Sequence, residues 1–596
     1  MIKEENMTAN NDGRTDYFWL VSCFLITTLA AFLRFFQLGL KPFHHDEGVN
    51  GFFLTTLFRE GIYKYDPANY HGPTLYYISL AFARVFGLET ITVRWSVAVF
   101  GVLTVALALY LKRYIGRIGS LFTALFLALS PGMVFISRYF IHEIFFIFLS
   151  LAIVVSILFF LDKRRAGVFA IGWMVLVLLM CFLPSSLNLA SALAGENNMT
   201  ALWAFRAAFF IVEAVLVFFV IRMLLAWNDG RPIYLLLASA SGALMFATKE
   251  TAFITLGTML IACACVWIWQ KIRGKSAIGT DELSGENLSW PKFREALGSG
   301  NDLLLISVGS AVVFIYINVL FFSSFFSHSE GVKGAIEAYT IWTKTSNKDH
   351  TQNGIWGYLT WGMKIEAPIM ILSVLGTVIA FIKARHRFAM FAGLWAFGLF
   401  AAYTIIPYKT PWLALSFLLP MCIAAGYGIN ELAASTNLMS KIAAGLLAVL
   451  ASAVLAFQTY ELNFVRYDDE DRVYVYAHTK REFLDLIKEI ERYANKSGKG
   501  NNAAVEIVTP DYWPMVWYLR EYPKAIFQAK LVDTDTAEMI VAKKGDQDKE
   551  AIRIYSANYR YAGSYALRPG VDLMLLVRKD LANSDARELY KITDPN

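Results

Sequence analysis

Long apolar runs, separated by short polar segments, fill most of the chain up to residue 460. A helix that crosses a membrane needs about 20 predominantly apolar residues. The runs that approach this length lie at residues 17–36, 91–111, 118–137, 144–161, 166–183, 205–226, 232–247, 251–269, 302–322, 365–382, 387–406, 412–430 and 438–458. The pattern predicts a mostly α-helical, polytopic membrane protein with about 13 transmembrane helices.

A further apolar stretch, at residues 73–86, is shorter than these runs and ends at Gly87. We expect it to form a helix that lies in the membrane interface, with a short span as the alternative. The interfacial interpretation keeps the number of spans odd, so that the two ends of the membrane region emerge on opposite sides.

Basic segments indicate the orientation, because lysine and arginine concentrate in cytoplasmic loops. If the spans alternate, the strongly basic segments share one side of the membrane; they lie at residues 112–117, 162–165, 222–231, 271–294 and 383–387. We therefore expect a cytoplasmic N-terminal tail at residues 1–16, a transmembrane domain at residues 17–458 and an extracytoplasmic C-terminal part.

The pattern changes after residue 458. Short β-like runs alternate with helical ones; the β-like runs lie at residues 504–508, 539–542 and 573–577, and the helical ones at 479–493 and 513–520. This alternation, over a length normal for one domain, predicts a soluble extracytoplasmic α/β domain at residues 459–596.

Composition supports the membrane interpretation and argues against nucleic-acid binding and cysteine-based sites. Hydrophobic residues make up 57% of the chain and charged residues only 17%, whereas soluble proteins carry about a quarter charged residues. The net charge of +6 is spread over the loops, so we expect no nucleic-acid partner. All five cysteines lie in apolar runs and predict neither a disulfide framework nor a CxxC metal site.

The polar segment that follows the first run has the sequence Lys41-Pro-Phe-His-His-Asp-Glu-Gly48. Carboxylates at the edge of a bilayer are costly, which makes them candidates for function, and we predict that Asp46 is a catalytic base. As alternatives, Asp46 and Glu47 are simply solvated, and His44 and His45 either orient the carboxylate or bind a metal. No HxxxH or HExxH spacing supports a metal site.

Further polar clusters fall on the same predicted outer face as Asp46. They are Arg138-Tyr139 with His142-Glu143, Thr248-Lys249-Glu250, and Tyr408-Lys409-Thr410-Pro411-Trp412. A carboxylate can take a proton from an acceptor group, and cationic side chains can hold a leaving phosphate. The clusters together predict transfer of a sugar from a lipid-phosphate carrier to an acceptor at the membrane surface.

Each cluster also has a plainer structural interpretation. These are an ion pair between Arg138 and Glu143, a helix-capping pair Lys249–Glu250, a Lys409 side chain that snorkels to the interface, and helix breaking by Pro407 and Pro411.

The segments 42–47, 70–77 and 407–412 resemble known enzymes. The first two are similar to the first extracytoplasmic loop of GT-C fold glycosyltransferases, which include protein O-mannosyltransferases, aminoarabinose lipid A transferases and the RgtA/B/C/D-like group. With the third segment, the chain most resembles the flippase-activity-associated protein Agl23-like family, over roughly residues 17–460. Residues 349–359, which include His350, are only loosely similar to a further stretch of the mannosyltransferases.

The resemblance implies an inverting transferase of a prokaryotic plasma membrane and cell envelope, with a dolichyl-phosphate-mannose-like polyprenyl-phosphate sugar as donor. The acceptor is a protein, lipid or glycan. The expected catalytic residues are Asp46, Glu47 and Glu143. The expected donor-binding residues are Lys249, Lys409, Arg138, His45 and Tyr408. The expected acceptor or supporting residues are His44, His71, His142, Glu250 and Trp412. The sequence identifies no specific cofactor and leaves a divalent cation open.

A second hypothesis is a lipid-linked sugar flippase or an accessory protein to one, which would move the donor between leaflets without chemistry. A secondary transporter is disfavoured, because the sequence has no repeated halves and no interrupted spans with ionisable residues at mid-membrane.

Overall fold

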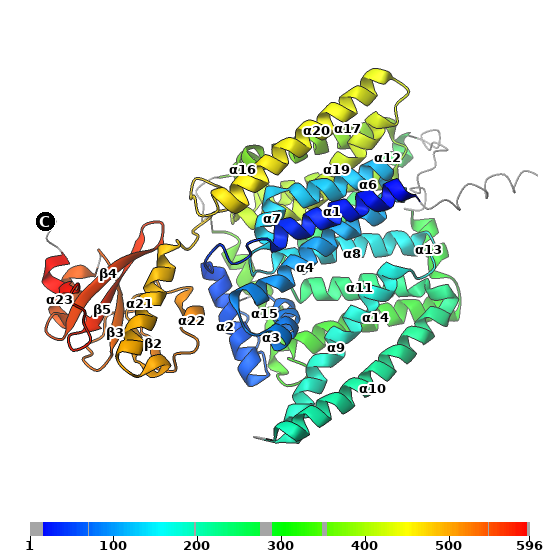
Figure 1. Cartoon of the computed structure of the whole chain (residues 1–596). Helices are drawn as coiled ribbons and strands as arrows, with labels where there is room; N and C mark the ends of the chain where they lie inside the picture. The colour runs from blue at the N-terminus through cyan, green and yellow to red at the C-terminus, as the bar shows by residue number, and fades with distance from the viewer. Residues whose placement is uncertain are drawn as a thin grey trace, which may run out of the picture.

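The structure is a computed structural model that describes residues 16–69, 71–195, 198–273, 289–348, 354–545 and 547–592. It has a large helical bundle and, at one end of it, a smaller region built on a β-sheet (Figure 1). Tyr70 and residues 349–353, which include His350, were used in the resemblance and lie outside the described residues.

Every predicted span coincides with a helical segment, although not every one is long enough to cross a membrane. The helices concerned are α1 (Tyr17–Phe35), α4 (Thr90–Ala108), α6 (Arg117–Leu129), α7 (Pro131–Ser137), α8 (Glu143–Leu161), α9 (Val168–Ala194), α10 (Met199–Ala226), α11 (Pro232–Phe246), α12 (Ala252–Arg273), α14 (Asn301–Phe322), α17 (Ala367–Lys383), α18 (Arg387–Ile405), α19 (Leu415–Ala433) and α20 (Leu438–Tyr460). Among the described residues, ten helices are long and apolar enough to cross a membrane, or twelve if two bent pairs each count as one span. The predicted helical membrane fold is therefore confirmed.

The spans depart from the prediction at three places. The predicted span 118–137 is broken into α6 and α7, which meet at 58°, because Pro131 cannot continue the hydrogen bonding of α6. The predicted span 365–382 is α17, and α16 (Gly357–Ile365) precedes it at 107°. The helix α11 has only 15 residues, fewer than a full crossing requires.

Short helices gather at the end of the bundle that faces the sheet (Figure 1). They include α2 (His45–Glu60), α3 (Thr74–Phe86), α15 (Glu330–Thr345) and α16. The helix α3, predicted to lie in the interface, has 13 residues and is too short to span. The start of α1 and α13 (Trp290–Leu297), from the predicted cytoplasmic loop, lie at the opposite end.

The sheet has the order β2-β1-β3-β5-β4-β6. Its strands are β1 (Val505–Ile507), β2 (Ala525–Phe527), β3 (Met539–Lys543), β4 (Tyr559–Arg568), β5 (Val571–Arg578) and β6 (Arg587–Glu588). The first three pair in parallel and the others antiparallel. Alternate residues of β3 and β5 point to opposite faces and join two apolar cores, one with α21 (Glu482–Lys496) and one with α23 (Asp548–Tyr555).

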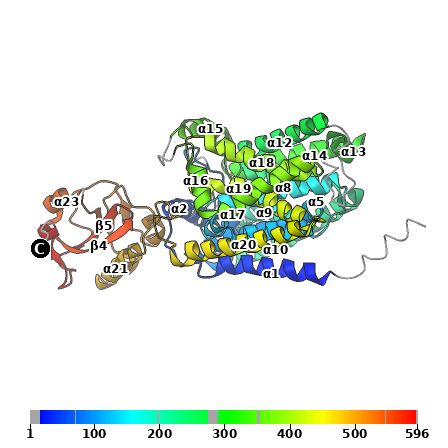
Figure 2. The same ribbon diagram turned by 90° about the horizontal axis from the view of Figure 1, so that it is seen from above.

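The predicted β-like runs correspond to β1, β3 and β5, whereas β2, β4, β6 and α23 were not predicted. The predicted helix 513–520 shrinks to α22 (Met515–Tyr518). The helix α20 continues past residue 458 through a π-helical turn (Glu461–Val465). In the view from above, α2 lies between the sheet region and the bundle (Figure 2).

Candidate active site

The segment with Asp46 is the start of the helix α2. His44 is the N-cap: its Nδ1 accepts a hydrogen bond from the Asp46 backbone N–H at 3.1 Å, and Glu47 accepts one from the His44 N–H at 3.0 Å. This reciprocal pair is a capping box in which histidine replaces the usual serine or threonine. The sequence motif therefore begins a helix, which the sequence did not predict.

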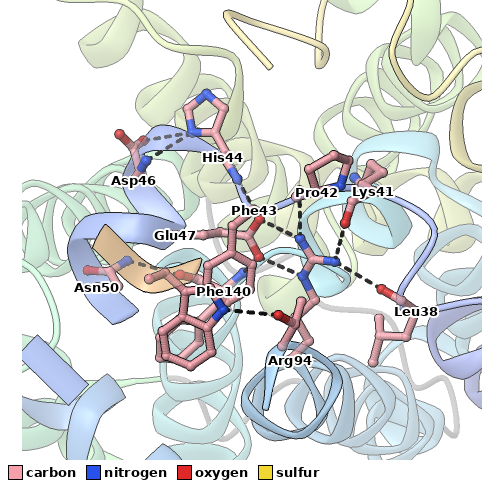
Figure 3. Close-up of polar contacts among 12 residues, drawn as sticks. Leu38, Lys41, Pro42, Phe43, His44, Asp46, Glu47, Asn50, Arg94 and Phe140 are labelled. Atoms are coloured by element: carbon pink, nitrogen blue, oxygen red, sulfur yellow. Dashed lines mark hydrogen bonds and ion pairs between the residues drawn. The ribbon is translucent and has the colours of Figure 1, made fainter. Parts of the chain in front are cut away.

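Glu47 is a fully buried structural carboxylate. Its two oxygens accept hydrogen bonds from Arg94 Nε at 2.7 Å and Arg94 Nη2 at 2.6 Å, and the Phe140 N–H donates another at 2.8 Å (Figure 3). The same guanidinium donates to the carbonyls of Leu38, Lys41 and Pro42. These bonds occupy the Glu47 carboxylate, so the geometry disagrees with the catalytic role predicted for it.

The sequence analysis missed Arg94. A signal existed, because Arg94 is the only charged residue in the apolar run of α4, and a lone intramembrane charge indicates a functional or structural partner. Only the fold shows that this partner is Glu47.

Asp46 points away from the Glu47–Arg94 pair (Figure 3). Its side chain is 39% exposed and has the His44 Nδ1 at 3.8 Å. Desolvation by the surrounding protein raises the pKa of Asp46, although the charge of His45 opposes this shift. The charge of Glu143 raises it further, and Lys249 acts in the opposite direction. The Asp46 carboxyl is thus within electrostatic reach of the other predicted clusters.

A buried ion pair and a partly buried histidine–carboxylate contact join those clusters. Lys249 Nζ donates to Glu143 Oε1 at 2.6 Å, and His71 Nδ1 lies 3.0 Å from Glu250 Oε2. Burial lowers the pKa of Lys249, but the carboxylates of Glu143 and Glu250 raise it above its ordinary value, so the ammonium stays charged. Glu143 therefore pairs with Lys249 and not, as one alternative had it, with Arg138.

Backbone hydrogen bonds hold two of the predicted motifs together. The Gly72 N–H donates to the Thr248 carbonyl at 3.1 Å, and the Thr74 N–H and hydroxyl both donate to the Ala247 carbonyl. A Cβ on Gly72 would lie 2.0 Å from the Ala247 oxygen, so only glycine allows this approach. The contact places His71 beside the Lys249 loop.

A pocket opens on these residues, with about 450 Å³ of open space. The predicted residues that line it are His71, Lys249, Glu250, Tyr408 and Trp412. Lining residues that the sequence analysis missed include Trp342, Tyr403 and Leu413. The structure therefore brings four separate chain segments to one cavity. Asp46 does not line this cavity, but the charges of Glu143 and Lys249 act on its carboxyl.

Two predicted donor-binding cations lie elsewhere. Arg138 is 1% exposed and donates to the carbonyls of Leu33, Phe36 and Gln37, so that it caps the end of α1. Lys409 Nζ donates to the carbonyls of Thr404 and Ile406 at 3.0 and 2.7 Å. Both geometries are those of helix-end caps, and the predicted roles as phosphate ligands stay predictions.

The histidines have separate surroundings. His142 Nε2 lies 3.1 Å from the Gly72 carbonyl, and its ring is 5.0 Å from that of His71. Burial lowers the pKa of His44 to about 4, and the ring of His45 faces Trp513 at 6.1 Å. Among the residues that the structure describes, no group of three or more His, Cys, Asp or Glu side chains is arranged to hold a metal ion.

Comparison with known proteins gives one family match. The model of the dolichyl-phosphate-mannose-protein mannosyltransferase family matches residues 61–189, a segment that contains His71, His142 and Glu143 but not Asp46. A comparison with curated protein sequences gives no match.

Solved structures resemble the chain over nearly its whole length. Apo ArnT from Cupriavidus metallidurans has a TM-score of 0.53 at 14% identity, covering 95% of this chain and 99% of that one. The same protein bound to undecaprenyl phosphate also has a TM-score of 0.53 at 14% identity, with 96% and 100% covered. Apo oligosaccharyltransferase from Archaeoglobus fulgidus has a TM-score of 0.47 at 12% identity, with 95% and 77% covered. The closer likeness to the Agl23-like family stays a prediction, whereas the GT-C fold predicted from the sequence is confirmed by ArnT.

Proposed function

We propose that this chain is an inverting glycosyltransferase that moves a sugar from a polyprenyl-phosphate donor to a protein, lipid or glycan acceptor. The family match, the GT-C fold and the relative bound to undecaprenyl phosphate support this class of reaction. We place the reaction on the extracytoplasmic face of a prokaryotic plasma membrane. The side of the membrane follows from α13, the predicted cytoplasmic segment, which lies at the opposite end of the bundle from α2.

The observation that carries the proposal is the half-exposed Asp46 carboxylate near a pocket with a cationic wall. In our proposal Asp46 takes the proton of the acceptor group as the new glycosidic bond forms. Its raised pKa makes it a stronger base than an ordinary aspartate. Glu47 fixes the start of α2 through Arg94 and takes no part in proton transfer.

The leaving phosphate binds at the pocket wall. Lys249 stays charged there because Glu143 is paired with it, and His71 lies beside it with its own carboxylate partner. A fixed cation at this place stabilises the charge that develops on the phosphate. Tyr408 and Trp412 give the pocket an aromatic side against which a sugar ring or the first lipid carbons pack.

The test is transfer from a labelled polyprenyl-phosphate sugar in proteoliposomes, with Asp46→Asn compared to Glu60→Gln. Glu60 is an exposed carboxylate at the far end of the same helix, so it controls for loss of charge. We expect product from the wild type and from Glu60→Gln, and a loss of about 10² to 10⁴-fold in Asp46→Asn. An Asp46→Asn variant that transfers at the wild-type rate would remove Asp46 as the base. Movement of the donor between leaflets without product would favour the flippase hypothesis.

A further inference from the structure

The sheet region makes its closest contact with the catalytic helix α2 at two glycines. A Cβ on Gly48 would lie 2.7 Å from the Pro514 Cα, and a Cβ on Gly51 would lie 2.6 Å from the Trp517 ring. Positions three apart share one face of a helix. This face of α2 therefore has no side chains at the contact, and the Trp513–Trp517 segment lies directly against the helix backbone, two residues from Asp46.

Hydrogen bonds from the same region hold the loop that precedes α2. The Phe43 N–H donates to the Tyr518 hydroxyl at 2.9 Å, and His44 Nε2 lies 3.0 Å from the Tyr476 carbonyl. Arg481 donates to the Leu40 carbonyl at 3.2 Å. Phe43 is fully buried, so its N–H has little access to water as a substitute acceptor.

Trp517 ties this loop to the bundle. Its ring stacks on Phe43 with the ring centres 4.8 Å apart, and its Nε1–H donates to the Thr90 hydroxyl at the start of α4 at 3.0 Å. The same helix carries Arg94, the partner of Glu47. The start of α2 is therefore fixed from the bundle side by Arg94 and from the sheet side by Trp517 and Tyr518.

We infer that the C-terminal sheet region is a positioning element of the active site, which holds the start of α2 and thereby fixes the place of Asp46. The inference rests on the proposed function, because it assigns Asp46 the chemistry. Tyr518 and Trp517 do not line the pocket and act through Asp46. The donor-binding wall belongs to other helices, so loosening α2 slows the chemical step and leaves donor binding intact.

Two variants loosen the contact from opposite sides. Tyr518→Phe removes the acceptor of the Phe43 N–H, and Gly51→Ala forces the Trp517 ring away from α2. A misplacement of about 1 Å can cost about 10²-fold in rate, so we expect kcat to fall about 10- to 100-fold, while KM for the donor changes less than about twofold. Matched controls are Tyr561→Phe, in the same sheet but away from α2, and Gly172→Ala, where nothing lies within 4 Å of the added Cβ.

Backbone hydrogen exchange of residues 43–51, measured on the full-length chain in detergent, gives a readout that does not need the reaction. We expect faster exchange there in both variants and wild-type exchange in both controls. Wild-type kcat, or a rise in KM with kcat unchanged, would overturn the positioning role, as would unchanged exchange. If the wild type transfers no sugar, the proposed function fails, and exchange alone then decides whether the sheet region holds α2.

Discussion

Glu47→Gln and Asp46→Asn each remove one negative charge from neighbouring positions of α2, yet we expect different effects. The first should destabilise the fold, and the second should abolish sugar transfer. Glu47 accepts two hydrogen bonds from Arg94 and one each from the His44 and Phe140 N–H groups. A glutamine oxygen can accept about two of these, and its NH₂ group would face the remaining donors. Breaking a buried ion pair by removing one partner costs about 3–5 kcal/mol, so Glu47→Gln should be strongly destabilising.

Asp46→Asn removes much less structure. The side chain is 39% exposed, and the His44 Nδ1, on a ring whose pKa burial lowers to about 4, lies 3.8 Å from its carboxylate. Changes at exposed positions usually alter stability by about 0.5 kcal/mol or less. We therefore expect Asp46→Asn to unfold like the wild type while it loses the transfer reaction.

The assay is unfolding in detergent, followed by tryptophan fluorescence, beside the transfer assay on the same preparations, with Glu60→Gln as the control for charge. Glu47→Gln should unfold at a clearly lower temperature or denaturant concentration than Asp46→Asn. If Glu47→Gln unfolds like the wild type and has lost transfer, while Asp46→Asn still transfers, then the assignment of the two carboxylates is reversed.

Further predictions concern pH, the buried ion pair and the loop contact. Burial raises the pKa of Asp46, so the base is protonated at low pH. We therefore expect kcat/KM to rise with pH and to level off only above the ordinary aspartate pKa of about 3.9. A kcat/KM that is already constant below that pH would contradict this. Lys249→Gln leaves Glu143 buried without its cation, which should lower the free energy of unfolding by about 3–5 kcal/mol. Adding Glu143→Gln should restore the stability measured in unfolding assays, whereas KM for the donor should stay raised. Gly72→Ala forces a Cβ within 2.0 Å of a backbone carbonyl and should lower both transfer and thermal stability. Gly172→Ala, whose added Cβ meets nothing within 4 Å, should lower neither.

Hydropathy was enough to predict the membrane helices, because apolar length alone decides whether a segment can cross. It did not predict the breaks. The bend between α6 and α7 follows from Pro131. The 107° turn between α16 and α17 has Pro368 as the second residue of α17, where proline is tolerated but cannot continue the hydrogen bonding of α16. The strands β2, β4 and β6 were missed because they are short or interrupted by glycine and charge. They form by pairing: β2 with β1, β4 with β5, and β6 with β4.

The gathering of polar clusters at one end of the bundle could be predicted from topology. An odd number of predicted spans precedes each of their loops, so all these loops fall on one side of the membrane. Their individual roles could not. Lys249 and His71 reach the pocket, whereas Arg138 and Lys409, equally basic and equally close to helix ends, bind backbone carbonyls. The difference depends on which carbonyls lie nearby in the fold, and sequence spacing contains no such information.

Helix geometry explains how adjacent carboxylates come to have different tasks. Neighbouring residues of an α-helix point about 100° apart, so when Glu47 turns inward to Arg94, Asp46 must turn outward. At the start of α2 the helix dipole favours the ionised form by about 0.3–1 kcal/mol, while burial favours the protonated form. Burial and the other charges together raise the pKa of Asp46, so the carboxylate is more basic than one in water, as the proposed general-base role requires. Both effects depend on where α2 begins, so the contacts that fix its first turn, from Arg94 on one side and from Trp517 and Tyr518 on the other, determine the basicity of Asp46 as well as its position.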